Sequence, residues 1–389
     1  MAETGPVRLL TPAFVALSLS DLAYFTAVGV LLATTPLFAS GPLGASAAGI
    51  GLAMGSFSIT TLVLRPWVGR WTDRHGRRWL LFGGAAAFAV ITVGHLFVSS
   101  LAALVALRLL LGAAEAMFFV AGFATLADLA PPNRAGEALS FNSLALYLGI
   151  AAGPVLGQAL LRWGGFNLAW IGAVTLALVA AAMAWRVPET HAPAGADDDP
   201  TPLVHPRAIV PGFALFCGVA VMSGFLAFAV LHARAVGIER WSGVLLIFGA
   251  TVVVCRVAFA KLPDRTGPAR LAGTALVVTA LGLVVVGSLT TPAGLVAGTV
   301  VLAVGVAFIT PAIFATVFTS VPASERGSAA ATTSVFIDLG LGGGPMLLGA
   351  MAAASSIPVA FLLAATLPLI GSLAMGLRGN PRVQATAAS

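Results

Sequence analysis

Three carboxylates lie inside long apolar stretches of this sequence, and they have the clearest capacity for chemistry. Of the fourteen Asp and Glu residues, only Asp21, Glu115 and Asp338 lie well within such stretches. An ionisable group at the centre of a membrane helix costs about 2.5–3.5 kcal/mol on insertion scales, so such groups usually face a water-filled cavity. A carboxylate in that position can take up a proton from one side and release it on the other.

An arginine accompanies one of these carboxylates. Arg108 precedes Glu115 by seven residues, which is nearly two turns of an α-helix and brings both side chains to one face. We expect this face to look into a central cavity. Two alternatives stay open: Glu115 forms a static ion pair with Arg108, or Asp21 and Asp338 are buried polar groups that fix helix packing. The proton-coupling interpretation rests first on Asp21 and Glu115, and then on Asp338.

The composition indicates what surrounds these groups. Hydrophobic residues make up 59% of the 389 residues and charged residues 9%, with a mean hydropathy of +1.01. A soluble domain carries about 25% charged residues, and a disordered chain has the opposite bias. The two cysteines, Cys217 and Cys255, lie in apolar runs, and the five histidines are scattered, so we expect neither a disulfide framework nor a metal site.

Twelve apolar segments predict an all-α membrane protein, because about 20 apolar residues cross the hydrocarbon core of a bilayer as a helix. The segments are too long for the strands of an outer-membrane barrel. The predicted spans are residues 12–38, 47–67, 79–98, 101–127, 138–161, 166–185, 208–231, 241–260, 271–289, 292–319, 329–350 and 355–377.

The basic residues orient these spans. With the N-terminus inside, fourteen of the twenty Lys and Arg fall on the cytoplasmic side, three fall outside, and three lie within or at the edge of a span. This bias and the even number of spans predict that both termini are cytoplasmic. The proline- and acid-rich residues 187–207 are predicted to form a flexible cytoplasmic linker between two six-helix bundles, residues 1–186 and 208–389.

The two halves repeat each other. A shift of 191 residues places Arg65 on Arg256 and Gly153 on Gly344, and the same offset holds over about 90 residues. Repeated halves of one orientation are typical of transporters that bind their solute between two bundles, near the bilayer midplane.

One loop carries a more specific pattern. Residues 69–78 read GRWTDRHGRR, which resembles the signature loop of the major facilitator superfamily. The matching residues are Gly69, Asp73, Arg74, Gly76, Arg77 and Arg78. The resemblance implies a conformational latch: the glycines allow close helix approach, Asp73 faces a helix N-terminus where the dipole favours an anion, and the arginines pair with Asp128. The alternative is a basic loop that only sets topology.

A second pattern lies in the fifth predicted span. Residues 149–158 read GIAAGPVLGQ, which resembles the proline–glycine motif of the twelve-helix drug:proton antiporter branch of the superfamily. Gly149, Gly153, Pro154 and Gly157 match, and Gln158 replaces the last glycine. The resemblance implies export. The alternative is close helix packing by small residues, which says nothing about direction.

Polar and aromatic residues on the helices expected to line a cavity complete the candidate site. They suit an apolar ligand with a cationic or polar tip, although most of the 23 phenylalanines are expected to face lipid or the protein core. The candidates are Tyr24, Phe25, Asn142, Tyr147, Phe225, Phe228 and Phe314.

The resulting hypothesis is a proton-coupled efflux antiporter for drugs or small amphipathic metabolites, working by alternating access in the bacterial cytoplasmic membrane. The expected partners are a small-molecule solute, protons and the lipid bilayer, with no nucleic acid, no cofactor and a monomeric chain. Export of a defined solute, such as a sugar, amino acid or siderophore, stays open, as does a non-transporting membrane sensor on the same scaffold. No nucleophile–base pattern, metal cluster or nucleotide loop indicates an enzyme.

Overall fold

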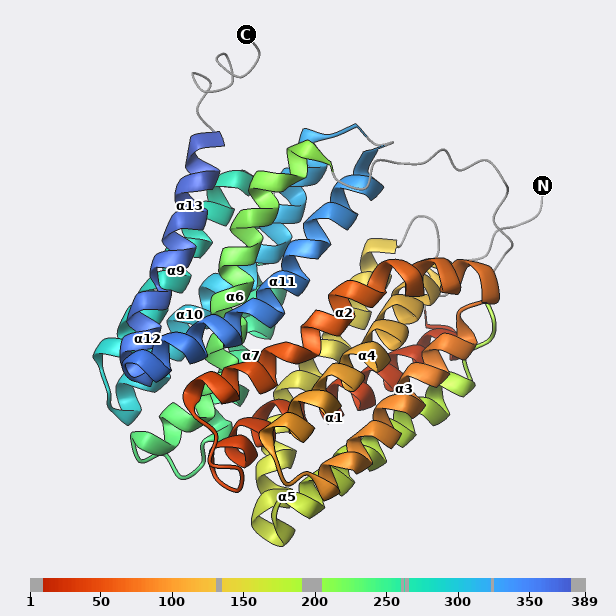
Figure 1. Ribbon diagram of the computed structural model, residues 1–389. Helices are drawn as coiled ribbons and strands as arrows, with labels where there is room; N and C mark the ends of the chain where they lie inside the picture. Colours follow the sequence, from red (N-terminus) through yellow and green to blue (C-terminus); the bar gives the residue numbers. More distant parts are fainter. Residues whose placement is uncertain are drawn as a thin grey trace, which may run out of the picture. The chain divides into compact units, whose positions relative to one another are not determined.

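The computed structural model describes residues 10–130, 135–190, 205–259, 262, 266–322 and 325–378. The regular elements in these residues are helices, so the predicted all-α fold is confirmed (Figure 1). The helices are α1 (Pro12–Ser40), α2 (Ala47–His75), α3 (Arg78–Val93), the 3-10 turn η1 (Gly94–Phe97), α4 (Leu101–Leu129), α5 (Ala135–Trp185), α6 (Pro206–Ala235), α7 (Ser242–Ala258), α9 (Pro268–Ser288), α10 (Pro292–Ser320), α11 (Arg326–Ala354), α12 (Ile357–Ala364) and α13 (Thr366–Arg378).

Ten helical segments of the described residues are long and apolar enough to cross a membrane, with α3 and η1 counted as one segment and α12 and α13 as another, and α7 is a shorter apolar helix. The longest, α5, is two helices joined at Gly164 and Gly165, whose backbone is not helical and whose φ at Gly165 is +68°. The chain reverses there, and Gly172 of the second arm packs against Leu160 of the first (Figure 1). Counting the arms separately and adding α7 brings the described apolar segments to twelve.

The chain divides into two compact units. The first comprises residues 1–34 and 60–196, and the second comprises residues 35–59 and 197–389. This differs from the predicted bundle boundary, since residues 35–59 join the second unit. Two glycines explain the difference: a Cβ atom on Gly51 or Gly55 would run into the backbone of α11. The first part of α2 therefore packs against α11 with almost no space for side chains.

Within the first unit, the glycines of the fifth predicted span press α5 against α1. A Cβ atom on Gly149 would lie 2.9 Å from the carbonyl oxygen of Leu22, and one on Gly153 would lie 2.6 Å from the Cα atom of Gly29. Small residues allow helix backbones to approach this closely in a membrane. We call this contact, with Gly157 against α1 one turn further along, the α1–α5 seam.

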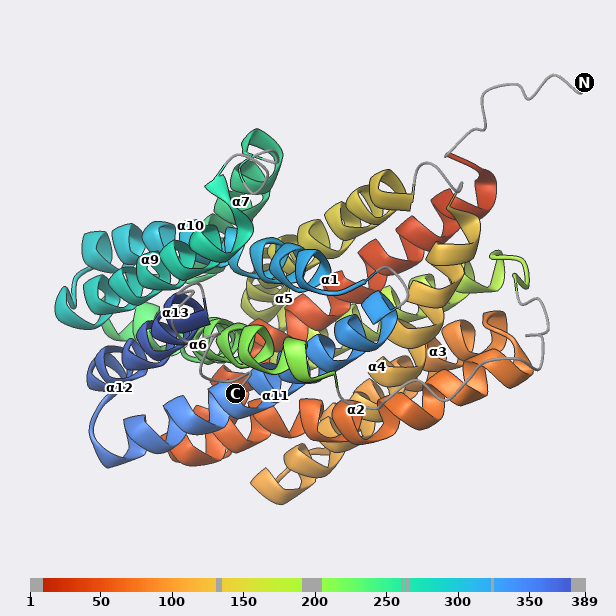
Figure 2. The ribbon, with the colours of Figure 1, turned by 90° about the horizontal axis from the view of Figure 1, so that it is seen from above.

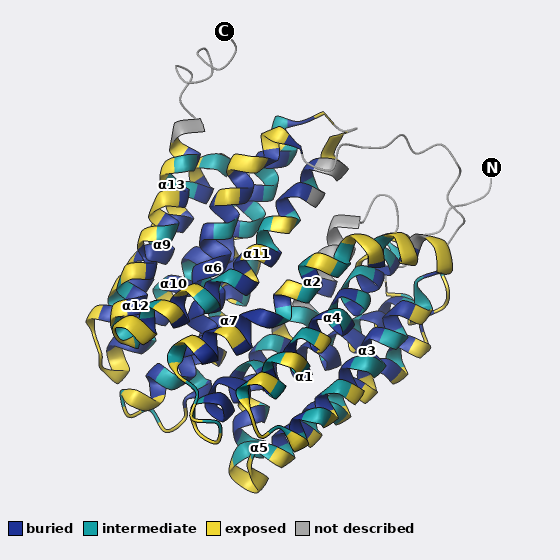
Figure 3. Ribbon diagram, in the orientation of Figure 1, coloured by how far each residue is buried: buried dark blue, intermediate teal, exposed yellow. Residues whose placement is uncertain are grey.

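The second unit repeats this contact between α6 and α11. A Cβ atom on Gly340 would lie 2.9 Å from the Cβ atom of Val219, and one on Gly344 would overlap the backbone of Ala220. The hydroxyl of Ser223 also donates a hydrogen bond of 2.8 Å to the carbonyl oxygen of Gly340. Helix α6 is the most deeply buried of the candidate spans (Figure 3). In the same unit, α9 and α10 lie side by side (Figures 1 and 2).

We expect Gly153→Ala to destabilise the protein, because the added methyl group meets backbone atoms of α1 that have no rotamer to change. Overpacking of this kind costs about 1–3 kcal/mol in the free energy of unfolding. The midpoint of thermal unfolding in detergent measures it. Gly376→Ala in α13 is the matched control, since no described atom lies within 4 Å of its added methyl group. Equal midpoints for the two variants would show that the seam tolerates a larger residue.

Candidate functional site

The centre of the candidate site is a carboxylate bonded to an amide. The side-chain nitrogen of Asn142, on α5, donates a hydrogen bond of 2.7 Å to Oδ2 of Asp21, on α1. Both side chains are buried, with 5% of Asp21 and 6% of Asn142 exposed. The proton-coupling candidate Asp21 and the cavity candidate Asn142 are therefore members of one pair.

The α1–α5 seam positions this pair. Asn142 lies seven residues, or about two helical turns, before Gly149 on α5. Gly149 rests against the carbonyl oxygen of Leu22, the residue next to Asp21. The two helix backbones are thus closest just beyond the pair, which brings the short Asp and Asn side chains within hydrogen-bonding distance.

A small pocket adjoins Asp21 and Asn142, with room for about one water molecule. Its walls are aromatic and come from α1 and α4: Phe25, Phe118, Phe119 and Phe123. Among the expected cavity residues, Phe25 and Asn142 therefore line a described pocket, whereas the side chain of Tyr147 lies outside the described part of the structure.

Three further candidates of the first unit, Tyr24, Arg108 and Glu115, are not among the residues that line this pocket. Tyr24 is fully buried, and its ring stacks on Phe118 with 3.9 Å between centroids. Tyr24 is not among the residues that line this pocket, and its place in a substrate cavity stays a prediction. Arg108 is buried within electrostatic range of His95, and Glu115 is half-buried within range of Tyr24. Arg108 and Glu115 each have additional interaction partners, so neither is an isolated charge.

The second unit holds the remaining candidates. Asp338, on α11, is only 2% exposed. Phe225 and Phe228 are fully buried, and the ring of Phe225 packs against Phe361 with 5.8 Å between centroids. These two phenylalanines pack as core residues here, and their place in a substrate cavity stays a prediction. Phe314 is half-buried, and its ring centroid lies 5.8 Å from that of Phe318 on the same helix.

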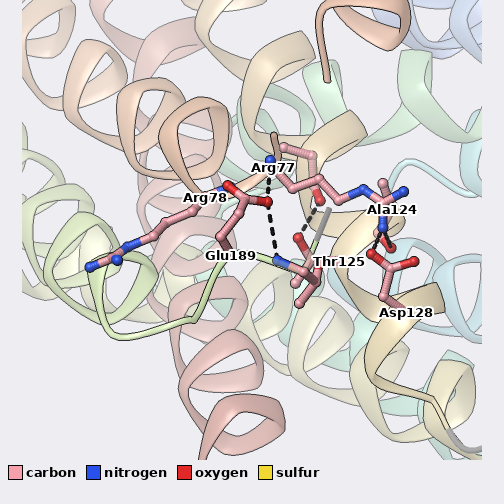
Figure 4. Close-up of polar contacts among 8 residues, drawn as sticks. Arg77, Arg78, Ala124, Thr125, Asp128 and Glu189 are labelled. Atoms are coloured by element: carbon pink, nitrogen blue, oxygen red, sulfur yellow. Dashed lines mark hydrogen bonds and ion pairs between the residues drawn. The ribbon is translucent and has the colours of Figure 1, made fainter. Parts of the chain in front are cut away.

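The signature loop forms an ion pair of the expected kind. The Arg77 guanidinium pairs with the Asp128 carboxylate at the end of α4, and it also donates a hydrogen bond of 3.3 Å to the carbonyl oxygen of Ala124 (Figure 4). Arg78 turns toward the end of α5, where it donates a 2.8 Å hydrogen bond to the carbonyl oxygen of Trp185 and lies 4.5 Å from the centre of its ring. The two arginines therefore connect the loop to two different helices.

The other loop residues contribute less to these contacts. Arg74 is exposed, and the side chain of Asp73 lies outside the described residues, so its predicted place at a helix N-terminus stays a prediction. A Cβ atom on Gly69 would meet no described atom within 4 Å, so Gly69 mediates no close helix approach in the described structure. Gly76 does have a strict requirement, because its φ of +89° favours glycine and a Cβ atom would lie 2.5 Å from the carboxylate of Glu189.

That carboxylate is the functional residue that the sequence interpretation missed. Glu189 accepts hydrogen bonds from the backbone N–H groups of Arg77, at 2.9 Å, and of Arg78, at 3.2 Å (Figure 4). It thereby caps the start of α3, where unpaired N–H groups and the helix dipole attract an anion. In the sequence, Glu189 falls within the predicted flexible linker, residues 187–207. An acidic residue directly after the last helix of the first unit was the available signal.

Comparison with known proteins gives the family. The sequence matches the Major Facilitator Superfamily over residues 17–340 and 241–388. The chain belongs to the major facilitator superfamily. This is a family of transporters rather than enzymes.

Relatives of this superfamily member cover nearly all of its length. It is 28% identical over 369 residues to an uncharacterized MFS-type transporter of Escherichia coli K12, YhhS, covering 92% of this chain and 90% of YhhS. It is 29% identical over 380 residues to the uncharacterized MFS-type transporter STM4428 of Salmonella typhimurium, with coverages of 92% and 93%.

Solved structures share the fold. The nucleoside transporter NupG, as its D323A mutant, matches with a TM-score of 0.80 at 16% identity, over 95% of this chain and 100% of NupG. A bacterial homologue of the human lysosomal transporter Spinster, in an inward-facing and occupied conformation, matches with a TM-score of 0.79 at 15% identity, over 94% and 95% of the two chains. At these identities the likeness concerns the fold alone.

We expect Glu189→Ala to loosen the start of α3, because two backbone N–H groups lose their shared acceptor. Loss of a capping side chain costs about 0.5–2 kcal/mol. Hydrogen–deuterium exchange should therefore become faster in peptides that cover residues 77–81. Glu239→Ala removes an exposed acid from the second unit and serves as the control. Unchanged exchange at residues 77–81 would mean that Glu189 does not hold this helix end in solution.

Proposed function

We propose that this protein is a proton-coupled antiporter that exports drugs or small amphipathic metabolites across the bacterial cytoplasmic membrane by alternating access. The observation that carries the proposal is the buried hydrogen-bonded pair of Asp21 and Asn142 beside an aromatic pocket. Membership of a transporter family accounts for the fold and favours transport over sensing. The coupling to protons and the direction of transport are our inference.

Asp21 supports proton coupling by its chemistry. An ionised carboxylate only accepts hydrogen bonds, whereas a protonated one also donates. Uptake of one proton therefore removes the negative charge from the pocket and changes what the neighbouring amide of Asn142 can bond to. A solute that needs the charge is released when the proton arrives, which is the exchange that an antiporter requires.

The contacts of the signature loop support the conformational part of the cycle. Arg77 links the loop to Asp128 on α4, and Glu189 links the same loop to the segment after α5. A change of conformation that moves α3 relative to α4 has to break the Arg77–Asp128 pair, so this pair can hold one state of the cycle. The loop therefore suits the role of a latch better than that of a topology signal alone.

The glycine motif of α5 gives weaker support for the direction of transport. Gly149 and Gly153 form the α1–α5 seam, so helix packing explains their presence without reference to export. Export rests on the resemblance to the antiporter branch. Export of one defined solute uses the same proton chemistry, and only the range of transported compounds distinguishes it from drug export.

We expect Asp21→Asn to abolish transport driven by a proton gradient while leaving the protein folded. The test uses proteoliposomes with an imposed gradient and three fluorescent or radiolabelled compounds: rhodamine 6G, Hoechst 33342 and chloramphenicol. Glu115→Gln and Asp338→Asn are measured in parallel, and Glu239→Gln is the control for loss of an exposed carboxylate. Gradient-driven transport that survives each of the three substitutions would rule out coupling through these acids. Transport of one compound alone would favour a defined solute.

A further inference from the structure

The pocket beside Asp21 has more hydrogen-bond acceptors than its own residues use. The carboxylate of Asp21 accepts one hydrogen bond from Asn142 through Oδ2. Since the amide nitrogen faces the carboxylate, the amide oxygen Oδ1 of Asn142 points elsewhere, and it is buried with no partner among the described residues. A buried polar atom without a partner has lost its hydrogen bonds to water, which is unfavourable. A ligand that brings hydrogen-bond donors would recover this free energy.

The charge of the pocket and the residues that line it limit which ligands it can bind. Asp21 is the charged residue among those that line the pocket, so an ionised pocket favours a cation. The faces of phenylalanine rings also attract cations. The Phe119 ring already makes one such contact, since the Arg65 guanidinium lies 5.2 Å from its centre. Phe123 is 44% exposed, and its ring centroid lies 4.8 Å from that of Phe119, so an aromatic surface continues outward from the pocket.

The size of the pocket sets the type of cation. Room for about one water molecule suits an ammonium group that carries N–H donors, whereas a quaternary ammonium is larger and donates nothing. We propose that Asp21 and Asn142 bind the head group of a protonated primary or secondary amine, and that the apolar part of the solute lies along the phenylalanines. This inference rests on the proposed function and names the class of solute that the antiporter exports.

The second unit provides an internal comparison. The α6–α11 seam repeats the α1–α5 seam, but the repeat partner of Asn142 at the same 191-residue offset is Thr333, whose hydroxyl bonds the carbonyl oxygen of Ala329 within its own helix. The seam alone therefore creates no site with a free amide oxygen. The acceptor pair is a specific addition to the first unit, as expected of a binding site rather than of a packing device.

The test measures binding, which requires no proton gradient. Isothermal titration calorimetry on the full-length protein in lipid nanodiscs compares phenethylammonium with its N,N,N-trimethyl derivative. We expect the primary amine to bind at least tenfold more tightly than the trimethyl compound. This comparison uses the unmodified protein, so it stands even if a variant fails to fold. Equal affinities would overturn the requirement for N–H donors.

Two variants locate the binding site. Asp21→Asn should abolish binding of phenethylammonium, and Asn142→Leu, which is similar in volume but lacks the amide, should weaken it at least tenfold. Asn167→Leu replaces an exposed asparagine of the second arm of α5 and should leave binding unchanged. Unchanged binding in Asn142→Leu would overturn the assignment. If phenethylammonium fails to bind while proton-driven transport of another compound persists, the amine inference is wrong and the proposed function stands.

Discussion

The contact on which the candidate site depends is the close approach of two helix backbones at the α1–α5 seam. Gly149 and Gly153 bring α5 to within van der Waals distance of the main chain of α1. Aspartate and asparagine have short side chains, so Asp21 and Asn142 can bond only if the two helices come this close. The glycines supply the distance, and the acid and the amide supply the chemistry, which is why these features occur on the same two helices.

The two units share the same close helix contact, but they carry different polar residues beside it. Gly340 and Gly344 press α11 against α6 in the second unit, so the duplication preserved the backbone contact. The polar pair was not preserved with it. The second unit has its own buried carboxylate, Asp338 on α11, which does not belong to the pocket of the first unit. The internal repeat therefore predicts the framework of both units but not the chemistry of either.

Much of the fold could be predicted from the sequence, because long apolar segments leave few alternatives in a membrane. The helical segments, the pairing of Arg77 with Asp128 and the tight packing at Gly153 all follow from composition or from motifs. The rest depended on geometry between distant segments. Sequence placed Asp21 and Asn142 in different roles because 121 residues separate them and no pattern pairs them. The sequence also could not predict the tight packing of Phe225, because helical position alone does not distinguish a core face from a cavity face.

Arg77 is held by two contacts of different kinds, one through its side chain and one through its main chain. Its side chain meets Asp128, whereas its main-chain N–H meets Glu189. The second attachment needs only a main-chain N–H at position 77, which every residue type except proline provides. A substitution at position 77 by any uncharged residue other than proline therefore removes the ion pair with Asp128 and retains the N–H that bonds Glu189.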